Sequence, residues 1–233
     1  MKEYLKKGIK ELSLDISKEK IDMLMVYLEF LQDYNEHTNL TAIRESKEIV
    51  EKHFLDTMLL YPILDKSAKN AIDIGTGAGF PGMVLAILNP DISVTLMDSV
   101  GKKTKFLSEL KEKLKLSNVT VVTSRAEDYI NIENRETYDI GLCRGVSKLN
   151  VIIEYILPFL RVGGHFYPQK FNEEEINEAK KALEELKGKI IKVHKLNLPY
   201  SKDSRIIIEI EKISKADKKY PRRTGVPNKY PLR

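Results

Sequence analysis

The beginning of the chain places its apolar residues at helical spacing. Between residues 17 and 34 they recur every three or four positions, and Ser17 is suited to cap the first turn. A second helix is expected over 46–61, and Pro62 ends it. The pattern therefore predicts a helical N-terminal section, which we assign to residues 1–66.

From Ala71 onward, short apolar runs alternate with amphipathic stretches. Helices are expected to start near Pro81, Lys102, Asn150 and Asn172. The alternation predicts βαβ units, and hence a doubly wound, mostly parallel sheet. Strands are expected over 71–74, 93–97, 119–122, 138–142, 164–167, 190–196 and 205–210.

The last two of these strands have no helix between them. Only a short loop containing Pro199 joins them. Because a short loop connects antiparallel strands, we expect this pair to be antiparallel at one edge of the sheet. We assign this α/β core to residues 67–211.

Composition excludes several classes of protein. Of the 233 residues, 42% are apolar and 31% charged, enough to bury a core. No apolar run reaches the roughly 18 residues of a membrane span, and residues 1–20 lack the pattern of a signal peptide, so a cytoplasmic protein without membrane contact is expected. A single cysteine and four scattered histidines predict neither a disulfide scaffold nor a metal site.

The positive charge is concentrated at the C-terminal end. Residues 212–233, the basic tail, carry a net charge of +7, which leaves −2 for residues 1–211 of a chain whose total is +5. Three prolines in this tail argue against a helix and favour an extended segment. Cations beside tyrosines suit unpaired RNA, while a solubilising extension and a tether to an acidic protein remain alternatives. The RNA-binding candidates are Lys219, Arg222, Arg223 and Lys229.

A glycine-rich loop, Asp73 to Gly82, follows the first expected strand. Glycines there allow close approach of the backbone to a ligand, and Asp98, at the end of the second strand, suits ribose hydroxyls. In the dinucleotide pattern G-x-G-x-x-G, the first glycine directly follows the strand. Here that glycine is Gly75, and counting from it gives G-x-G-x-G, which favours S-adenosylmethionine as the cofactor. A dinucleotide-binding module stays the alternative. The candidate cofactor contacts in this loop are Gly75, Gly77 and Gly79.

The third and fourth strands end in further candidates. Ala126 and Glu127 follow the third strand, near the expected adenine position. Arg144 ends the fourth strand, where ligands of open sheets bind, and needs an anionic or acceptor-rich partner. Its neighbour Cys143 is alternatively the nucleophile of a cytosine-C5 RNA methyltransferase. In the helical section, His53 and Asp56 share a helix face, which is more typical of a core pair than of a catalytic one.

Taken together, these residues resemble the RsmG (GidB) family, bacterial enzymes that methylate guanine N7 in 16S, small-subunit, ribosomal RNA. The resemblance covers nearly the whole chain, with Gly145 and Lys103 standing where alanine and arginine are common. It rests on Asn39-Leu40-Thr41, His53 with Asp56, residues 73–82, Asp98-Ser99 with Lys102-Lys103 and Phe106-Leu107, Arg125-Ala126-Glu127, Arg144, and residues 219–232.

The resemblance implies a class I, Rossmann-like methyltransferase core behind the helical N-terminal section. It implies that S-adenosylmethionine contacts Gly75, Phe80, Ala126, Glu127 and Arg144, and that a family lysine near the RNA corresponds to Lys170. The implied partner is small-subunit ribosomal RNA or a ribosomal particle. Since guanine N7 loses no proton, Arg144 is expected to act by orientation, as the one catalytic residue that we name.

Overall fold

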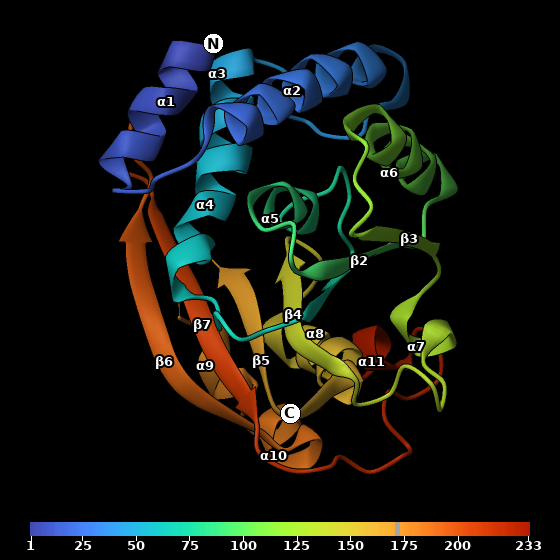
Figure 1. Ribbon diagram of the computed structural model, residues 1–233. Coiled ribbons are helices and arrows are strands. Elements are labelled where there is room, and N and C mark those ends of the chain that lie inside the picture. The colour runs from blue at the N-terminus through green and yellow to red at the C-terminus, as the bar shows by residue number, and fades with distance from the viewer. Residues whose placement is uncertain (171–172) are drawn as a thin grey trace.

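The computed structural model describes residues 1–170 and 173–233, and it is built around a seven-stranded sheet (Figure 1). The strand order is β3-β2-β1-β4-β5-β7-β6. The expected doubly wound α/β sheet is confirmed. The strands are β1 (Asn70–Ile74), β2 (Ser93–Asp98), β3 (Val119–Thr123), β4 (Tyr138–Arg144), β5 (Leu160–Lys170), β6 (Gly188–Asn197) and β7 (Ser204–Lys212).

Strands β1 to β5 are parallel, and the last two strands depart from this direction. β7 pairs antiparallel with both β5 and β6, as in the register of Phe166 with Ile210 and of Val193 with Ile208. The antiparallel pair expected at the edge is therefore confirmed, with β7 inserted next to β5 and β6 forming the outer edge. This arrangement brings the start of β7 beside the carboxyl end of β5.

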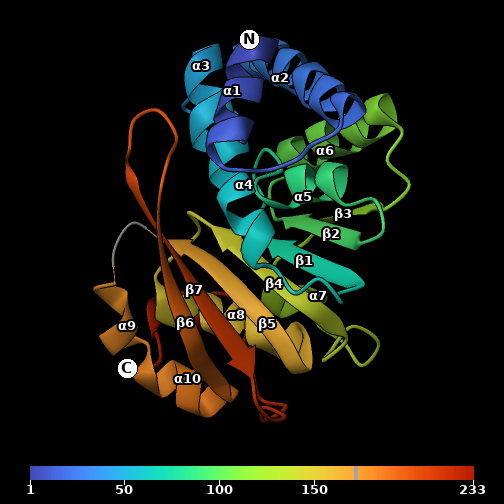
Figure 2. The same ribbon diagram turned by 60° about the vertical axis from the view of Figure 1, so that its left-hand side comes forward.

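Helices cover both faces of the sheet (Figure 2). One face packs against the N-terminal helices together with α5 and α6, and the other against α8 and α10. The helices of the core are α5 (Gly82–Leu88), α6 (Gly101–Leu114), α7 (Ala126–Tyr129), α8 (Leu149–Ile156), α9 (Glu175–Glu178) and α10 (Lys180–Leu186), and the 3₁₀ turn η3 (Leu157–Phe159) follows α8. The helix start expected near Asn172 lies outside the described residues.

The N-terminal section is joined to the sheet by a common apolar core. It begins with α1 (Lys2–Glu11), which the sequence analysis missed although Leu5 and Ile9 are spaced for a helix and are buried. α2 (Lys18–Thr38) is the first expected helix, and the Ser17 hydroxyl accepts from a backbone N–H of its first turn, as a cap does. Tyr27 of α2 is fully buried and stacks on Phe80 of the glycine loop, with ring centroids 5.2 Å apart.

The second expected helix is not a uniform α-helix. It consists of α3 (Ser46–Ile49), a π-helical segment η1 (Val50–Leu55), α4 (Asp56–Leu60) and a 3₁₀ turn η2 (Tyr61–Ile63). A π-helical turn is wider than an α-helical turn, and such segments are frequent at functional sites. Here the Lys52 carbonyl within η1 accepts a hydrogen bond from a side chain of the sheet, Nη1 of Arg144, at 3.0 Å.

The basic tail folds back onto the core. The expectation of an extended segment without a helix was wrong, because α11 (Val226–Lys229) forms there with Pro227 in its first turn, a position that proline tolerates. Tyr220 and Pro227 are buried against the core. In the described residues, no helix is long and apolar enough to cross a bilayer.

Candidate active site

Two adjoining cavities lie at the carboxyl ends of the parallel strands, which is where ligands of open α/β sheets bind. The smaller, of about 400 Å³, lies between the ends of β1, β2 and β3, the loop before α8 and Tyr155 of α8. The larger, of about 950 Å³, lies between β4, β5, β7 and the N-terminal section. Gly75, Lys103 and Gly145 line both. A molecule in one cavity is therefore next to a molecule in the other.

The glycine loop between the cavities is shaped by a buried carboxylate. Asp73 is fully buried at the end of β1, and its Oδ2 accepts from Thr76 Oγ1 at 2.6 Å and from Gly82 N at 2.8 Å. Burial raises the pKa of Asp73 to about 6. Gly75 has a φ of +72°, and an added Cβ would lie 2.3 Å from Val146, so both the turn and the packing require glycine.

Asp98, from the end of β2, fixes the other side of this loop. Its Oδ2 accepts from Gly77 N at 3.0 Å and pairs with Lys103 Nζ at 3.2 Å, while Oδ1 accepts from Val100 N at 2.9 Å. The carboxylate is 5% exposed and lines the smaller cavity. It is thereby held in one orientation, as a carboxylate that binds a ribose must be.

The end of β3 and the basic tail form the outer part of the smaller cavity. Ala126 and Glu127 line it, and so do Gly225 and Asn228 of the tail. Glu127 Oε1 accepts from Gly225 N at 3.1 Å. In the described residues, the backbone of the tail is thus a hydrogen-bond partner of Glu127.

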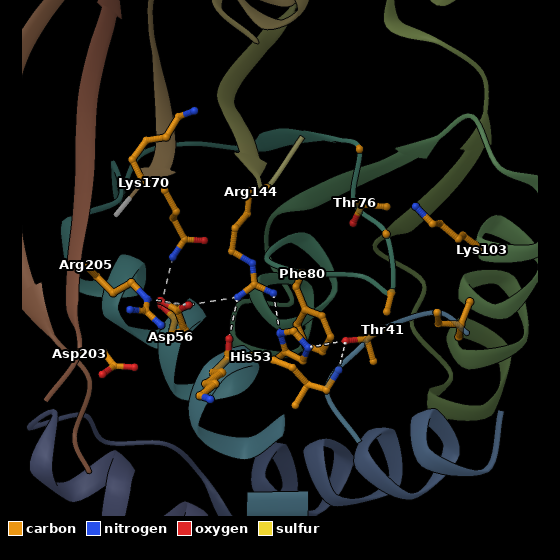
Figure 3. Close-up of a pocket in the computed structure, with 18 of the residues that line it drawn as sticks. Thr41, His53, Asp56, Thr76, Phe80, Lys103, Arg144, Lys170, Asp203 and Arg205 are labelled. Carbon is orange, nitrogen blue, oxygen red and sulfur yellow. Dashed lines mark hydrogen bonds and ion pairs between the residues drawn. The ribbon is translucent and has the colours of Figure 1, made fainter. Parts of the chain in front are cut away.

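Arg144 lines the larger cavity and lies between Asp56, His53 and Phe80 (Figure 3). Its Nη1 donates to the Lys52 carbonyl at 3.0 Å and lies 3.3 Å from Asp56 Oδ2, and its Nη2 lies 2.8 Å from His53 Nδ1. The guanidinium carbon is 5.3 Å from the centroid of the Phe80 ring. All of these partners except Phe80 come from the helical section, which therefore positions this arginine of the sheet.

His53 is held as a neutral hydrogen-bond bridge. Burial, reinforced by the positive charge of Arg144, lowers its pKa to about 3. Because an arginine can only donate, Nδ1 of His53 is the acceptor and the proton resides on Nε2, which lies 3.1 Å from Thr41 Oγ1. Thr41 is fixed in turn by two backbone hydrogen bonds with the Asn35 side chain. This network explains why the Asn39-Leu40-Thr41 and His53 motifs occur together.

Asp56 lies between two arginines. Its Oδ2 is 3.1 Å from Nε of Arg205, at the start of β7, as well as 3.3 Å from Arg144. Burial raises the pKa of Asp56, and the two guanidinium groups oppose that shift. Arg205 is not among the residues predicted from the sequence. The available signal was an arginine at the start of an otherwise apolar strand, where it needs a buried partner.

The predicted cofactor residues fall into two groups. Gly75, Asp98, Ala126 and Glu127 line the smaller cavity, whereas Gly77, Phe80 and Arg144 line the larger one. Gly79 lines neither cavity: its φ is +100° and an added Cβ would lie 2.6 Å from the Tyr27 hydroxyl, so it serves the packing of α2.

Cys143 is not accessible to a substrate. Its side chain is 1% exposed, and burial raises the pKa of the thiol well above its ordinary value. A nucleophilic cysteine needs the opposite environment, with access and a stabilised thiolate. The cytosine-C5 interpretation has no support in this arrangement.

The predicted RNA-binding residues differ in their surroundings. Lys170 pairs with Glu175 at 2.8 Å beside the larger cavity, and Arg222 pairs with the fully buried Glu154. Lys219, Arg223 and Lys229 are exposed. Their contact with RNA stays a prediction.

Comparison with known proteins gives the family. The family model described as GidB, rRNA small subunit methyltransferase G, matches residues 20–205. The chain belongs to this family. A relative from Fusobacterium nucleatum subsp. nucleatum, named ribosomal RNA small subunit methyltransferase G, is 53% identical over 233 residues, covering 100% of both chains. One of the same name from Desulforamulus reducens is 43% identical, covering 98% of this chain and 97% of the relative. The predicted RsmG (GidB) membership is confirmed.

Solved structures agree in fold. A SAM dependent methyltransferase from Aquifex aeolicus matches with a TM-score of 0.55 at 16% identity, over 71% of this chain and 93% of that one. M. jannaschii TYW2 in complex with AdoMet matches with a TM-score of 0.57 at 19% identity, over 74% and 80%. The class I methyltransferase fold is therefore confirmed, and the dinucleotide-binding alternative is not supported.

Proposed function

We propose that this protein uses S-adenosylmethionine to methylate N7 of a guanine in small-subunit ribosomal RNA. The observation that carries the proposal is the meeting of the two cavities at Gly75, Lys103 and Gly145, beside Arg144. The smaller cavity takes the cofactor and the larger takes the base. The division into the section 1–66, the core 67–211 and the tail 212–233 stays a prediction.

The smaller cavity fits the cofactor. Its volume, about 400 Å³, lies within the range of small-molecule sites, roughly 300–1,000 Å³. Gly75 lines the cavity, Asp98 offers carboxylate oxygens to ribose hydroxyls, and Ala126 with Glu127 offers hydrogen-bond partners to adenine. When bound, S-adenosylmethionine supplies a methyl group on a positively charged sulfur.

Guanine N7 suits a site that contains no general base. N7 carries an in-plane lone pair and no proton, so the chain needs only to hold the base in line and exclude water. His53 does not act as a base in this proposal, because a pKa of about 3 makes it a weak base and Arg144 occupies its acceptor nitrogen. Arg144 is a catalytic residue here, because its remaining N–H groups can donate to guanine O6 and so hold the base while the N7 lone pair stays free to attack the methyl group.

The methylated base is cationic, and Arg144 then repels it. That repulsion favours release of the product. A guanine inside an RNA duplex is hard to reach at its N7 position, so the target base lies in a loop or is extruded into the larger cavity. Exposed Lys219, Arg223 and Lys229 supply phosphate contacts, and the substrate is naked ribosomal RNA or a ribosomal particle in the cytoplasm.

Nucleoside analysis tests this function. The protein is incubated with labelled S-adenosylmethionine and ribosomal RNA from cells that lack its gene, and the digested RNA is analysed by mass spectrometry. We expect label in 7-methylguanosine, and none when the RNA comes from cells that carry the gene. Label in 5-methylcytidine would instead support the Cys143 mechanism and overturn the proposal.

A further inference from the structure

The basic tail lies along one side of the smaller cavity. Its positive charge alone predicted contact with RNA and not a position at this cavity. Gly225 and Asn228 line that cavity together with Ala126 and Glu127 of the core. Figure 1 shows α11 beside α7 and α8, the two helices that flank the cavity. One wall of the cavity thus belongs to a segment that lies 70 residues beyond Tyr155, the nearest other lining residue in the sequence.

A buried ion pair fastens the tail to the core. Glu154 of α8 is 0% exposed, and its Oε2 accepts from Arg222 Nη2 at 2.6 Å while Oε1 accepts from Arg222 Nε at 2.9 Å. The backbone N–H of Arg222 also donates to Oε1, at 2.8 Å. Removing Arg222 leaves a buried carboxylate without its countercharge, which is costly. The docked position of the tail therefore depends on this pair.

Next to the cavity, the tail presents polar groups that match adenine. Ser147 Oγ donates to Asn228 Oδ1 at 3.2 Å, and in the described part of the chain no acceptor is recorded for Asn228 Nδ2. A carboxamide N–H is a natural donor to a ring nitrogen of adenine, and the same group can accept from its amine. Glu127, meanwhile, is already oriented by Gly225 N at 3.1 Å.

We propose that the basic tail forms the outer wall of the adenosine site, that Asn228 contacts the adenine, and that the Arg222–Glu154 pair holds this wall in place. This inference rests on the proposed function, in which the smaller cavity holds the cofactor. Because the cofactor makes all of its contacts only when the tail is docked, its apparent affinity decreases as the fraction of molecules with a docked tail decreases. Cofactor and docked tail therefore stabilise each other.

Two neighbouring arginines provide a matched test. Arg222→Ala and Arg223→Ala remove the same charge from adjacent positions, but only Arg222 pairs with Glu154. Full-length variants are titrated calorimetrically with S-adenosylhomocysteine, in the absence of RNA. We expect Arg222→Ala to weaken binding of S-adenosylhomocysteine at least about tenfold, because the tail is then undocked in most molecules. Arg223→Ala should bind it with an affinity within about twofold of the wild-type value. Equal affinities of Arg222→Ala and wild type would overturn the proposal.

Asn228→Ala tests the wall without touching the ion pair. Asn228 is exposed, so its truncation does not threaten the fold, and this variant serves if Arg222→Ala proves insoluble. We expect a several-fold loss of affinity for both S-adenosylhomocysteine and 5′-methylthioadenosine, because the contact lies at the adenosine end. A loss seen only with the homocysteine compound, or no loss with either, contradicts an adenine contact.

Hydrogen exchange separates this inference from the function on which it rests. S-adenosylhomocysteine should slow exchange of the amides of residues 224–229 in the wild-type protein, and not in Arg222→Ala. If the wild type binds no S-adenosylhomocysteine, the proposed function fails. If it binds but the tail amides exchange as fast as without ligand, the function stands and the tail is no part of the cofactor site.

Discussion

The N-terminal section and the basic tail both close cavities at the same edge of the sheet, but by different means. The N-terminal section contributes fully buried side chains such as Leu24, Tyr27 and Phe54 to the main core. The tail contributes only four buried side chains, those of Lys212, Ala216, Tyr220 and Pro227, and is otherwise held by hydrogen bonds and by the ion pairs Lys212–Glu136 and Arg222–Glu154.

This difference predicts different dynamics for the two closures. Burial of apolar surface is the main stabilising contribution in folding, so the N-terminal section and the sheet should unfold together. A segment attached mainly by polar contacts can open locally at low cost. The walls of the larger cavity are thus permanent, whereas the wall that the tail gives to the smaller cavity is reversible.

The largest expected effect contrasts two buried tyrosines. Tyr27→Ala should lower the free energy of unfolding by about 3–5 kcal/mol, because it empties a site between α2, Phe54 and Phe80. Tyr220→Ala should cost clearly less, because a loss within the tail is limited to the free energy of docking the tail. Urea denaturation measures both. Equal losses would show that the tail is as integral to the fold as the helical section.

Next in size is the loss of the arginine that the N-terminal section positions. Arg144→Ala should reduce methyl transfer at least about 100-fold, as expected when a reacting base is misplaced. The adjacent change Cys143→Ala, at a buried thiol, should retain most of the activity. Circular dichroism must show both variants folded. Inactivity of Cys143→Ala with an active Arg144→Ala would reverse the assignment of roles.

A smaller effect concerns the pH dependence of stability. The pKa of His53 is about 3 in the folded protein and about 6.5 when unfolded, so between these values the unfolded chain binds the extra proton and stability falls on acidification. From pH 7 to pH 5, wild type should therefore lose about 1 to 2 kcal/mol more than His53→Asn, which keeps an acceptor for Arg144.

Asp73 titrates in the opposite sense and provides the control. Its folded pKa of about 6 lies above the unfolded value of about 3.9, so its contribution is present at low pH and is lost as the pH rises through about 4 to 6. Denaturation curves of His53→Asn and Asp73→Asn at pH 5 and pH 7 should thus deviate from wild type in opposite directions. Deviations of the same sign would refute the assigned charge states.

The smallest expected effect concerns Arg223, which is exposed on the tail, whereas its neighbour Arg222 pairs with buried Glu154. Arg223→Ala should reduce the salt slope of RNA binding by about 0.7, the value for one phosphate contact of a single strand. Lys7→Ala removes the same charge from α1, which lies far from α11 in Figure 1, and should leave the slope unchanged. The slope is measured by fluorescence anisotropy over a salt series. Identical slopes for wild type and Arg223→Ala would mean that this arginine meets no phosphate.

The sequence by itself determined the sheet and the cofactor loop. Alternating apolar runs specify parallel strands, because side-chain periodicity is a local property of the chain. The glycine loop was equally readable, since the positive φ of Gly75 and the carboxylate of Asp98 depend on residues within one βαβ unit. The short helix α1 was missed although Leu5, Ile9 and Leu12 already stand at helical spacing.

Only the tertiary structure decided how distant segments complete the two cavities. Arg205 meets Asp56 across 149 positions and Arg222 meets Glu154 across 68, and no local periodicity encodes such pairs. The π-helical turn at Lys52 and the folding back of the basic tail likewise follow from contacts with the sheet. Charge described the tail correctly as basic, but its position was set by the buried carboxylate of Glu154, which needs a cation to offset its loss of water.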